Sequence, residues 1–148
     1  MVIRDQIPMP PRALSQCLVD GTTPEEWYAL LNSMIFFWVD PKRLARQANA
    51  CSPWPQLMFE IDAEKLIDRH AQRAFVTPFN VGSATRRPAP RGKASFVPVA
   101  AWNENRWEYE STGLKRPLRP SSHRPAELTV RDAVADAMDF VLRMTRID

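Results

Sequence analysis

Glycine, cysteine and histidine are scarce in this chain of 148 residues, which contains four, two and two of them. The two cysteines, Cys17 and Cys51, cannot form a disulfide framework, so we expect a reducing, cytoplasmic setting. With only His70 and His123 and no C-x-x-C pair, the sequence predicts no metal site. No apolar run approaches the roughly 20 residues of a membrane span, and the N-terminus lacks the apolar core of a secretory leader.

The sequence also lacks the common catalytic and nucleotide-binding motifs. It contains no P-loop, no G-x-G-x-x-G, no G-x-S-x-G and no H-E-x-x-H. A function therefore has to be sought in the spacing of individual polar residues.

Proline, in contrast, is abundant, and positive charge is concentrated in one region. The 14 prolines with few glycines predict stiff loops rather than flexible linkers. The stretch 86–124 carries nine Lys or Arg against three Glu, a net charge of +6 within a chain of net charge +3. Residues 78–125 are therefore predicted to be a long Pro/Arg-rich loop region, and 86–124 within it to form a basic, mobile surface that contacts phosphates. The basic residues are Arg86, Arg87, Arg91, Lys93, Arg106, Lys115, Arg116, Arg119 and Arg124.

The stretch 23–44 is expected to organise the fold. Thr23 and Glu26 form a capping-box pattern at the start of a helix, with Pro24 at its first position. The run Met34 to Val39 is continuously apolar and rich in aromatic and β-branched residues, which predicts a central strand buried on both faces. Asp40 then caps the next helix. Alternation along the strand places Phe36 and Trp38 on one face and Ile35 and Phe37 on the other.

The remaining pattern predicts a single α+β domain over residues 1–148. Early strands and helices alternate, whereas the late strands follow one another without helices, which favours mixed or antiparallel sheets with flanking helices. Predicted helices cover 12–19, 24–31, 41–49 and 63–71, with a helical turn at 132–138. Predicted strands cover 34–39, 56–61, 73–77, 96–99, 127–130 and 140–145, and 101–125 is predicted to be a long excursion containing Trp102, Trp107 and Tyr109.

The segment from Pro78 to Phe96 is the first candidate site. It offers neutral polar side chains, a glycine that permits close backbone approach, and arginines that can clamp phosphate oxygens. These residues are Asn80, Ser83 and Thr85, then Gly82, then Arg86, Arg87 and Arg91. The alternative interpretation is a solvated basic loop held stiff by proline.

Glu127 is the second candidate, because it begins an apolar strand directly after the basic region. A carboxylate in that position can face a cleft and act on a developing cation or on the proton of a nucleophile. The alternative is an exposed residue paired with a nearby arginine. The Arg4-Asp5 pair is a weaker candidate, since such a dipeptide is usually part of the surface. Aromatic residues near the basic region can stack bases or simply pack in the core.

Five segments together resemble a family of uncharacterised bacterial proteins close to the DarT-like ADP-ribosyltransferases. The resemblance covers nearly the whole chain from Arg4, and the segment after Thr77 is its most specific part. The segments are R-D-Q-I-P at 4–8, the L-L-N and I-F-F-W groups within 30–38, D-P-K-R-L at 40–44, F-N-V-G-S-A-T-R-R-P-A-P-R-G at 79–92 and E-L-T-V at 127–130.

This resemblance implies an ADP-ribosyltransferase-like fold, with two small packed sheets and an NAD cleft between them. It implies that Arg4 handles phosphates, that Phe36 or Phe37 lines the nicotinamide pocket, and that Glu127 is catalytic. Cofactor-binding roles are implied for Asn80, Gly82, Ser83, Thr85 and Arg86. It also implies an upstream strand with a His-x-Thr motif that anchors NAD, so the domain is expected to be N-terminally incomplete and its first strand missing.

Two functions remain open. The first is an NAD-dependent ADP-ribosyltransferase-like protein, toxin-like or degenerate, with a nucleic-acid or protein acceptor. The second is a non-enzymatic module whose basic loop binds nucleic acid or an acidic protein. The enzyme requires Glu127 in a cleft with Arg4 and Asn80, whereas the module requires arginines presented on an outer face.

Overall fold

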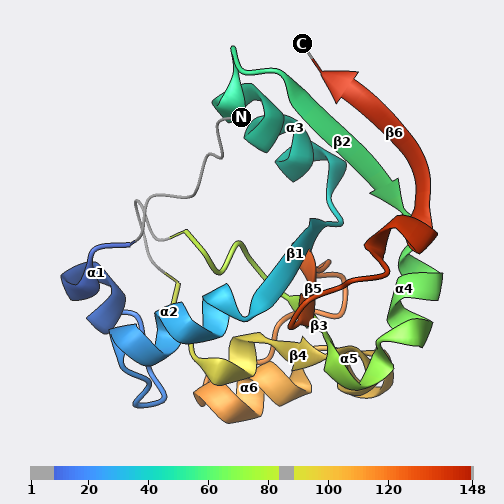
Figure 1. Ribbon diagram of the computed structural model, residues 1–148. Coiled ribbons are helices and arrows are strands. Elements are labelled where there is room, and N and C mark those ends of the chain that lie inside the picture. Colours follow the sequence, from blue (N-terminus) through green and yellow to red (C-terminus); the bar gives the residue numbers. More distant parts are fainter. Residues whose placement is uncertain (1–8, 84–88, 148) are drawn as a thin grey trace.

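Two antiparallel sheets with helices around them make up the computed structural model, which describes residues 9–83 and 89–147 (Figure 1). The larger sheet has the order β1-β5-β3-β4, and the smaller one pairs β2 with β6. The predicted α+β class is confirmed at this level. The strands are β1 (Met34–Trp38), β2 (Gln56–Ile61), β3 (Ala74–Thr77), β4 (Val97–Pro98), β5 (Glu127–Arg131) and β6 (Val141–Ile147).

The first long helices begin where the capping residues predict. Thr23 accepts a hydrogen bond from the N–H of Glu26, and the Glu26 carboxylate accepts one from the N–H of Thr23, which confirms the capping box. Asp40 and Asp62 each cap the helix that follows them through a side-chain oxygen. The helices are α1 (Pro11–Ser15), α2 (Pro24–Asn32), α3 (Pro41–Cys51), α4 (Ala63–Arg69), α5 (Val99–Asn105) and α6 (Glu108–Leu114). Short 3-10 turns cover Ala71–Arg73, Lys93–Ser95 and Ala137–Phe140.

Strand β1 is an edge strand of the larger sheet, so the prediction that it is central is wrong. It pairs only with β5 within this sheet, and the inner strands are β5 and β3. Ile35 and Phe36 remain 43% and 38% exposed. The apolar run misled the prediction because residues of β1 line two cavities instead of packing between neighbouring strands.

The predicted division of the two faces of β1 is confirmed by its register with β5. Trp38 lies opposite Glu127, whereas Phe37 lies opposite Leu128, and directly opposed residues project to the same side. Phe37 packs against one hydrophobic core and Met34 belongs to the other. The first core contains Leu66, Ala74, Val76, Val97, Val99, Trp107, Leu128, Val130 and Phe140. The second contains Met9, Leu14, Cys17, Trp27, Met34, Val81 and Phe96.

The stretch 101–125 is not the predicted long loop, because α5 and α6 occupy much of it. Trp107 is fully buried between these helices and the loop that follows, and its Nε1 donates a hydrogen bond to the carbonyl of His123 at 2.9 Å. Both helices lack a side-chain cap, and both end at residues with positive φ, Arg106 and Lys115, instead of glycine. The usual start and stop signals were therefore missing from the sequence.

Candidate functional site

A cavity of about 800 Å³ lies on the face of the larger sheet that carries Trp38 and Glu127. Its lining comes from α1, α2, β1, α3, the segment after β3 and the start of β5. The residues that matter for its chemistry are Tyr28, Phe36, Trp38, Asn80, Gly82 and Glu127. The cavity volume is in the range of small-molecule binding sites.

Glu127 is positioned by the register of the sheet. It lies opposite Thr77 on β3, and its side chain accepts a 2.7 Å hydrogen bond from the Thr77 hydroxyl. The N–H of Val81 donates to the same oxygen, Oε2, at 3.3 Å. The residue is only 4% exposed, yet it lines the cavity. The strand and the segment after β3 thus fix one carboxyl oxygen and hold the group at the cavity wall.

The protonation of this site follows from its geometry. The Thr77 hydroxyl has one proton but two acceptors in reach, Glu127 Oε2 at 2.7 Å and the carbonyl of Phe79 at 3.0 Å. Burial raises the pKa of Glu127 above its ordinary value of 4.5, against the opposing effects of these hydrogen bonds and of positive charge on Arg43 and Arg91. A protonated Glu127 can donate to the Thr77 oxygen and leave the threonine proton for the carbonyl of Phe79.

Arg91 does not clamp phosphate, contrary to the prediction. Its side chain is buried, 1% exposed, and its guanidinium donates to the carbonyls of Val81 at 2.7 Å and Ala89 at 3.1 Å. It also lies over the ring of Phe79, with its Cζ 5.1 Å from the ring centroid. Burial lowers the pKa of Arg91. The prediction failed because amino-acid composition does not distinguish an exposed arginine from a buried one that donates to main-chain carbonyls.

Two further arginines of the predicted basic surface, Arg116 and Arg119, pair with a buried carboxylate. Glu110 is fully buried and accepts hydrogen bonds from Arg119 at 2.6 and 3.0 Å and from Arg116 at 3.3 Å. Arg119 also approaches the ring of Phe79 at 5.6 Å. The continuous basic surface predicted for 86–124 is therefore broken up. Among the described residues of that stretch, the exposed cations are Lys93, Arg106, Lys115 and Arg124.

The structure brings some predicted site residues together and separates others. Phe36, Asn80, Gly82 and Glu127 share the cavity, whereas Phe37 lies on the opposite face of the sheet. Ser83 is half-buried in the turn after Asn80, whose carbonyl accepts a hydrogen bond from its N–H at 3.3 Å. Arg4, Thr85, Arg86 and Arg87 lie outside the described residues.

Three residues of the site were not predicted: Tyr28, Trp38 and Thr77. Trp38 was detectable, because it follows Phe36 by two residues in a strand and so shares its face. Thr77 could be found only from the register that sets it opposite Glu127. Tyr28 reaches the cavity from α2, and its hydroxyl donates to the carbonyl of Met9. Such contacts between distant segments have no local sequence signal.

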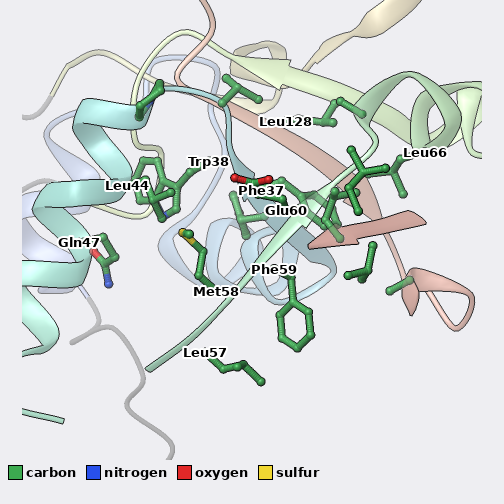
Figure 2. Close-up of a pocket in the computed structure, with 18 of the residues that line it drawn as sticks. Phe37, Trp38, Leu44, Gln47, Leu57, Met58, Phe59, Glu60, Leu66 and Leu128 are labelled. Atoms are coloured by element: carbon green, nitrogen blue, oxygen red, sulfur yellow. The ribbon is translucent and has the colours of Figure 1, made fainter. Parts of the chain in front are cut away.

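A second cavity, of about 810 Å³, lies between the two sheets (Figure 2). Figure 2 shows Leu44 and Gln47 of α3 and Met58 of β2 around it, with Phe37 and Leu128 from the larger sheet. Its lining is mostly apolar. The carboxylate of Glu60 also lines it and pairs with Arg143 of β6. Glu127 does not line this cavity, although Phe36, Trp38 and Gln47 line both cavities, so the two spaces adjoin along β1 and α3.

Metal and membrane sites are not indicated by the described part of the chain. Within residues 9–83 and 89–147, no group of three or more His, Cys, Asp or Glu side chains could hold a metal ion. In the same residues, no helix has both the length and the apolar character needed to cross a bilayer.

The observed architecture defines an α+β protein with two antiparallel sheets and a buried carboxyl group in an aromatic cavity. The chain belongs to the family of unknown function DUF7002, whose model matches residues 1–141. Neither the comparison with curated proteins nor the comparison with solved structures gave a match.

Proposed function

We propose that the protein is an NAD-dependent ADP-ribosyltransferase-like enzyme in which Glu127 is the catalytic carboxylate. One observation carries the proposal: Glu127 lines an aromatic cavity together with Asn80 and Gly82, at the start of a late strand. The alternative, a binding module, requires Glu127 to lie outside any cleft. The position of Glu127 in the wall of the cavity therefore supports the enzyme.

The cavity residues fit the chemistry of glycosyl transfer from NAD. The rings of Phe36 and Trp38 offer faces for the nicotinamide, and Gly82 allows close approach of a backbone to the ligand. In its ionised form, Glu127 would stabilise positive charge that develops on the ribose as its bond to nicotinamide breaks. The same carboxylate would take the proton of the acceptor as the new bond forms. A nucleic-acid or protein group would serve as the acceptor.

Ionisation of Glu127 would depend on the ligand. Burial raises the pKa of this carboxyl and favours its protonated form, whereas a positive charge placed beside it favours loss of the proton. A cationic group bound in the cavity would therefore lower the pKa of Glu127 and increase the fraction of the carboxyl that is ionised.

Transfer of labelled ADP-ribose from NAD to DNA, RNA and protein acceptors tests this proposal. Glu127→Gln keeps the size of the side chain and should lower turnover by about 10²–10³-fold while NAD still binds, because the lost charge acts mainly in the transition state. Glu104→Gln, at an exposed position of α5, serves as the matched control and should leave transfer unchanged. Equal transfer by the wild type and Glu127→Gln would remove Glu127 from the mechanism.

A binding module that meets nucleic acid or an acidic protein is the second candidate, supported by the exposed Lys93, Arg106, Lys115 and Arg124. Its affinity for a polyanion should fall with salt, by about 0.7–0.9 in the log–log slope for each phosphate contacted. Absence of both NAD binding and transfer, together with salt-dependent binding to DNA or RNA, would favour this function over the enzyme.

A further inference from the structure

Three aromatic side chains line the same cavity as the carboxyl group of Glu127. Tyr28 comes from α2, Phe36 and Trp38 come from β1, and Trp38 lies directly opposite Glu127 in the sheet. Aromatic faces carry negative electrostatic potential and attract cations, more strongly where water is excluded. The rings and the carboxyl group therefore favour the same sign of charge on a ligand.

The polar groups of the cavity also favour a ligand that donates hydrogen bonds. Asn80 lines the cavity, and its Oδ1 is buried without a donor in the described part of the chain. Both hydrogen bonds that Glu127 accepts there go to Oε2. A buried acceptor without a donor is costly, so a ligand N–H that reaches Asn80 or Glu127 would be stabilised.

The charged groups nearest to Glu127 do not provide a site for an anion. Arg91 uses its guanidinium on main-chain carbonyls, and Arg43 of α3 pairs with Asp40 at 3.5 Å. Neither forms an ion pair with Glu127 among the described residues. An anion entering the cavity would meet a carboxyl group and an amide oxygen, whereas a cation would meet two acceptors and aromatic faces.

We propose that this cavity binds planar cations that carry N–H donors, of the amidinium or guanidinium class. The inference rests on the proposed function in that it takes Glu127 as the ligand-facing carboxylate of the same site. Flat groups suit the cavity because they stack on rings while their edges donate to Glu127 and Asn80. On binding, the carboxylate pairs with the cation, and any proton that Glu127 still holds in the free protein passes to solvent.

Calorimetric titration with benzamidine, a planar cation, and benzamide, its neutral analogue of nearly the same shape, tests the inference. The wild type should bind benzamidine about tenfold or more tightly than benzamide, as expected for one charge-assisted contact. Glu127→Gln should lose this preference, whereas Glu104→Gln should keep it. At a pH at which the free protein still holds a proton on Glu127, titration in two buffers of different ionisation enthalpy should reveal more proton release with benzamidine from the wild type than from Glu127→Gln.

A second variant keeps the test valid if Glu127→Gln does not fold. Phe36→Leu removes a ring at a position that is 38% exposed, and it should weaken benzamidine more than benzamide. Equal affinity of the wild type for both compounds, or binding of neither, would overturn the inference. The same holds if folded Glu127→Gln retains the preference. If the protein prefers the cation but does not transfer ADP-ribose, the proposed enzymatic function is wrong and this inference stands. If it transfers ADP-ribose without a preference for the cation, only this inference is wrong.

Discussion

Glu127 and Arg91 both form hydrogen bonds to the backbone of one residue, Val81. The carboxyl of Glu127 accepts from the N–H of Val81, and the guanidinium of Arg91 donates to its carbonyl. Val81 is fully buried, and Asn80 and Gly82 beside it line the cavity. Glu127 and Arg91 do not pair with each other. Together they fix the segment after β3 through the backbone of Val81.

The first prediction concerns the pH dependence of stability. Because the pKa of Glu127 is raised in the folded state, the native protein holds this proton above pH 4.5, where the unfolded chain releases it. The wild type should therefore lose stability as the pH rises from about 4.5 through the raised pKa. The loss should be about 1.4 kcal/mol for each pH unit that separates the folded pKa from the unfolded one. Below pH 4.5 this penalty is absent.

Urea unfolding of the wild type and Glu127→Gln across this pH range measures the effect. The difference in unfolding free energy, variant minus wild type, should increase with pH, since glutamine does not ionise. A difference that stays constant would show that the folded protein does not raise the pKa of Glu127.

The second prediction concerns Arg91. Arg91→Met keeps the apolar stem but removes the donors to the buried carbonyl of Val81 and the half-buried carbonyl of Ala89. An unsatisfied buried acceptor costs about 1–3 kcal/mol, so loss of the contact with Val81 alone should lower the free energy of unfolding by that amount. Arg12→Met, at an exposed position of α1, should change it by less than about 0.5 kcal/mol. Similar effects of the two substitutions would mean that Arg91 is not structurally anchored.

The third prediction concerns Glu110, which is buried beneath Arg116 and Arg119. Glu110→Gln removes the negative charge from hydrogen bonds with two cations and should cost about 1.5–3 kcal/mol. Combining it with Arg119→Gln should cost less than the sum of the single effects, because the interaction is already lost. Additive effects in chemical denaturation would argue that Glu110 and Arg119 do not interact. Glu108→Gln, exposed on the same helix, is the control.

The fourth prediction concerns the start of α2. Thr23→Ala removes the oxygen that accepts from the N–H of Glu26 and should lower the free energy of unfolding by about 1 kcal/mol. Thr23→Ser retains a hydroxyl in the same place and should recover most of the loss. Equal loss in both variants would assign the effect to the methyl group instead of the cap.

The sequence predicted what local chemistry controls and failed where distant segments decide. The caps at Thr23 and Asp40 and the opposite faces of Phe36 and Phe37 follow from neighbours along the chain, and the structure contains them. The edge position of β1 depends on its partner strand, which no local pattern specifies.

The candidate site was predictable only in part for the same reason. Glu127 stood out by its place before an apolar strand, and Asn80 and Gly82 by their loop chemistry. Their shared cavity, however, results from the pairing of β3 with β5. Arg91 was predicted wrongly. Its charge and proline-rich surroundings suggested exposure, whereas the fold buries it and its guanidinium donates to carbonyl oxygens.

The pairing of β2 with β6 has a consequence for local opening of the native state. This ladder has two strands and curves away from the larger sheet (Figure 1), and Leu57, Phe59 and Met144 on it are 54%, 42% and 54% exposed. Two-stranded sheets are marginally stable on their own, so the ribbon should open without global unfolding. Its amides should exchange with deuterium through this local event, and faster than those of β3 and β5. The larger sheet around Glu127 would then be the part of the molecule that resists opening, and β2 and β6 the part that opens locally.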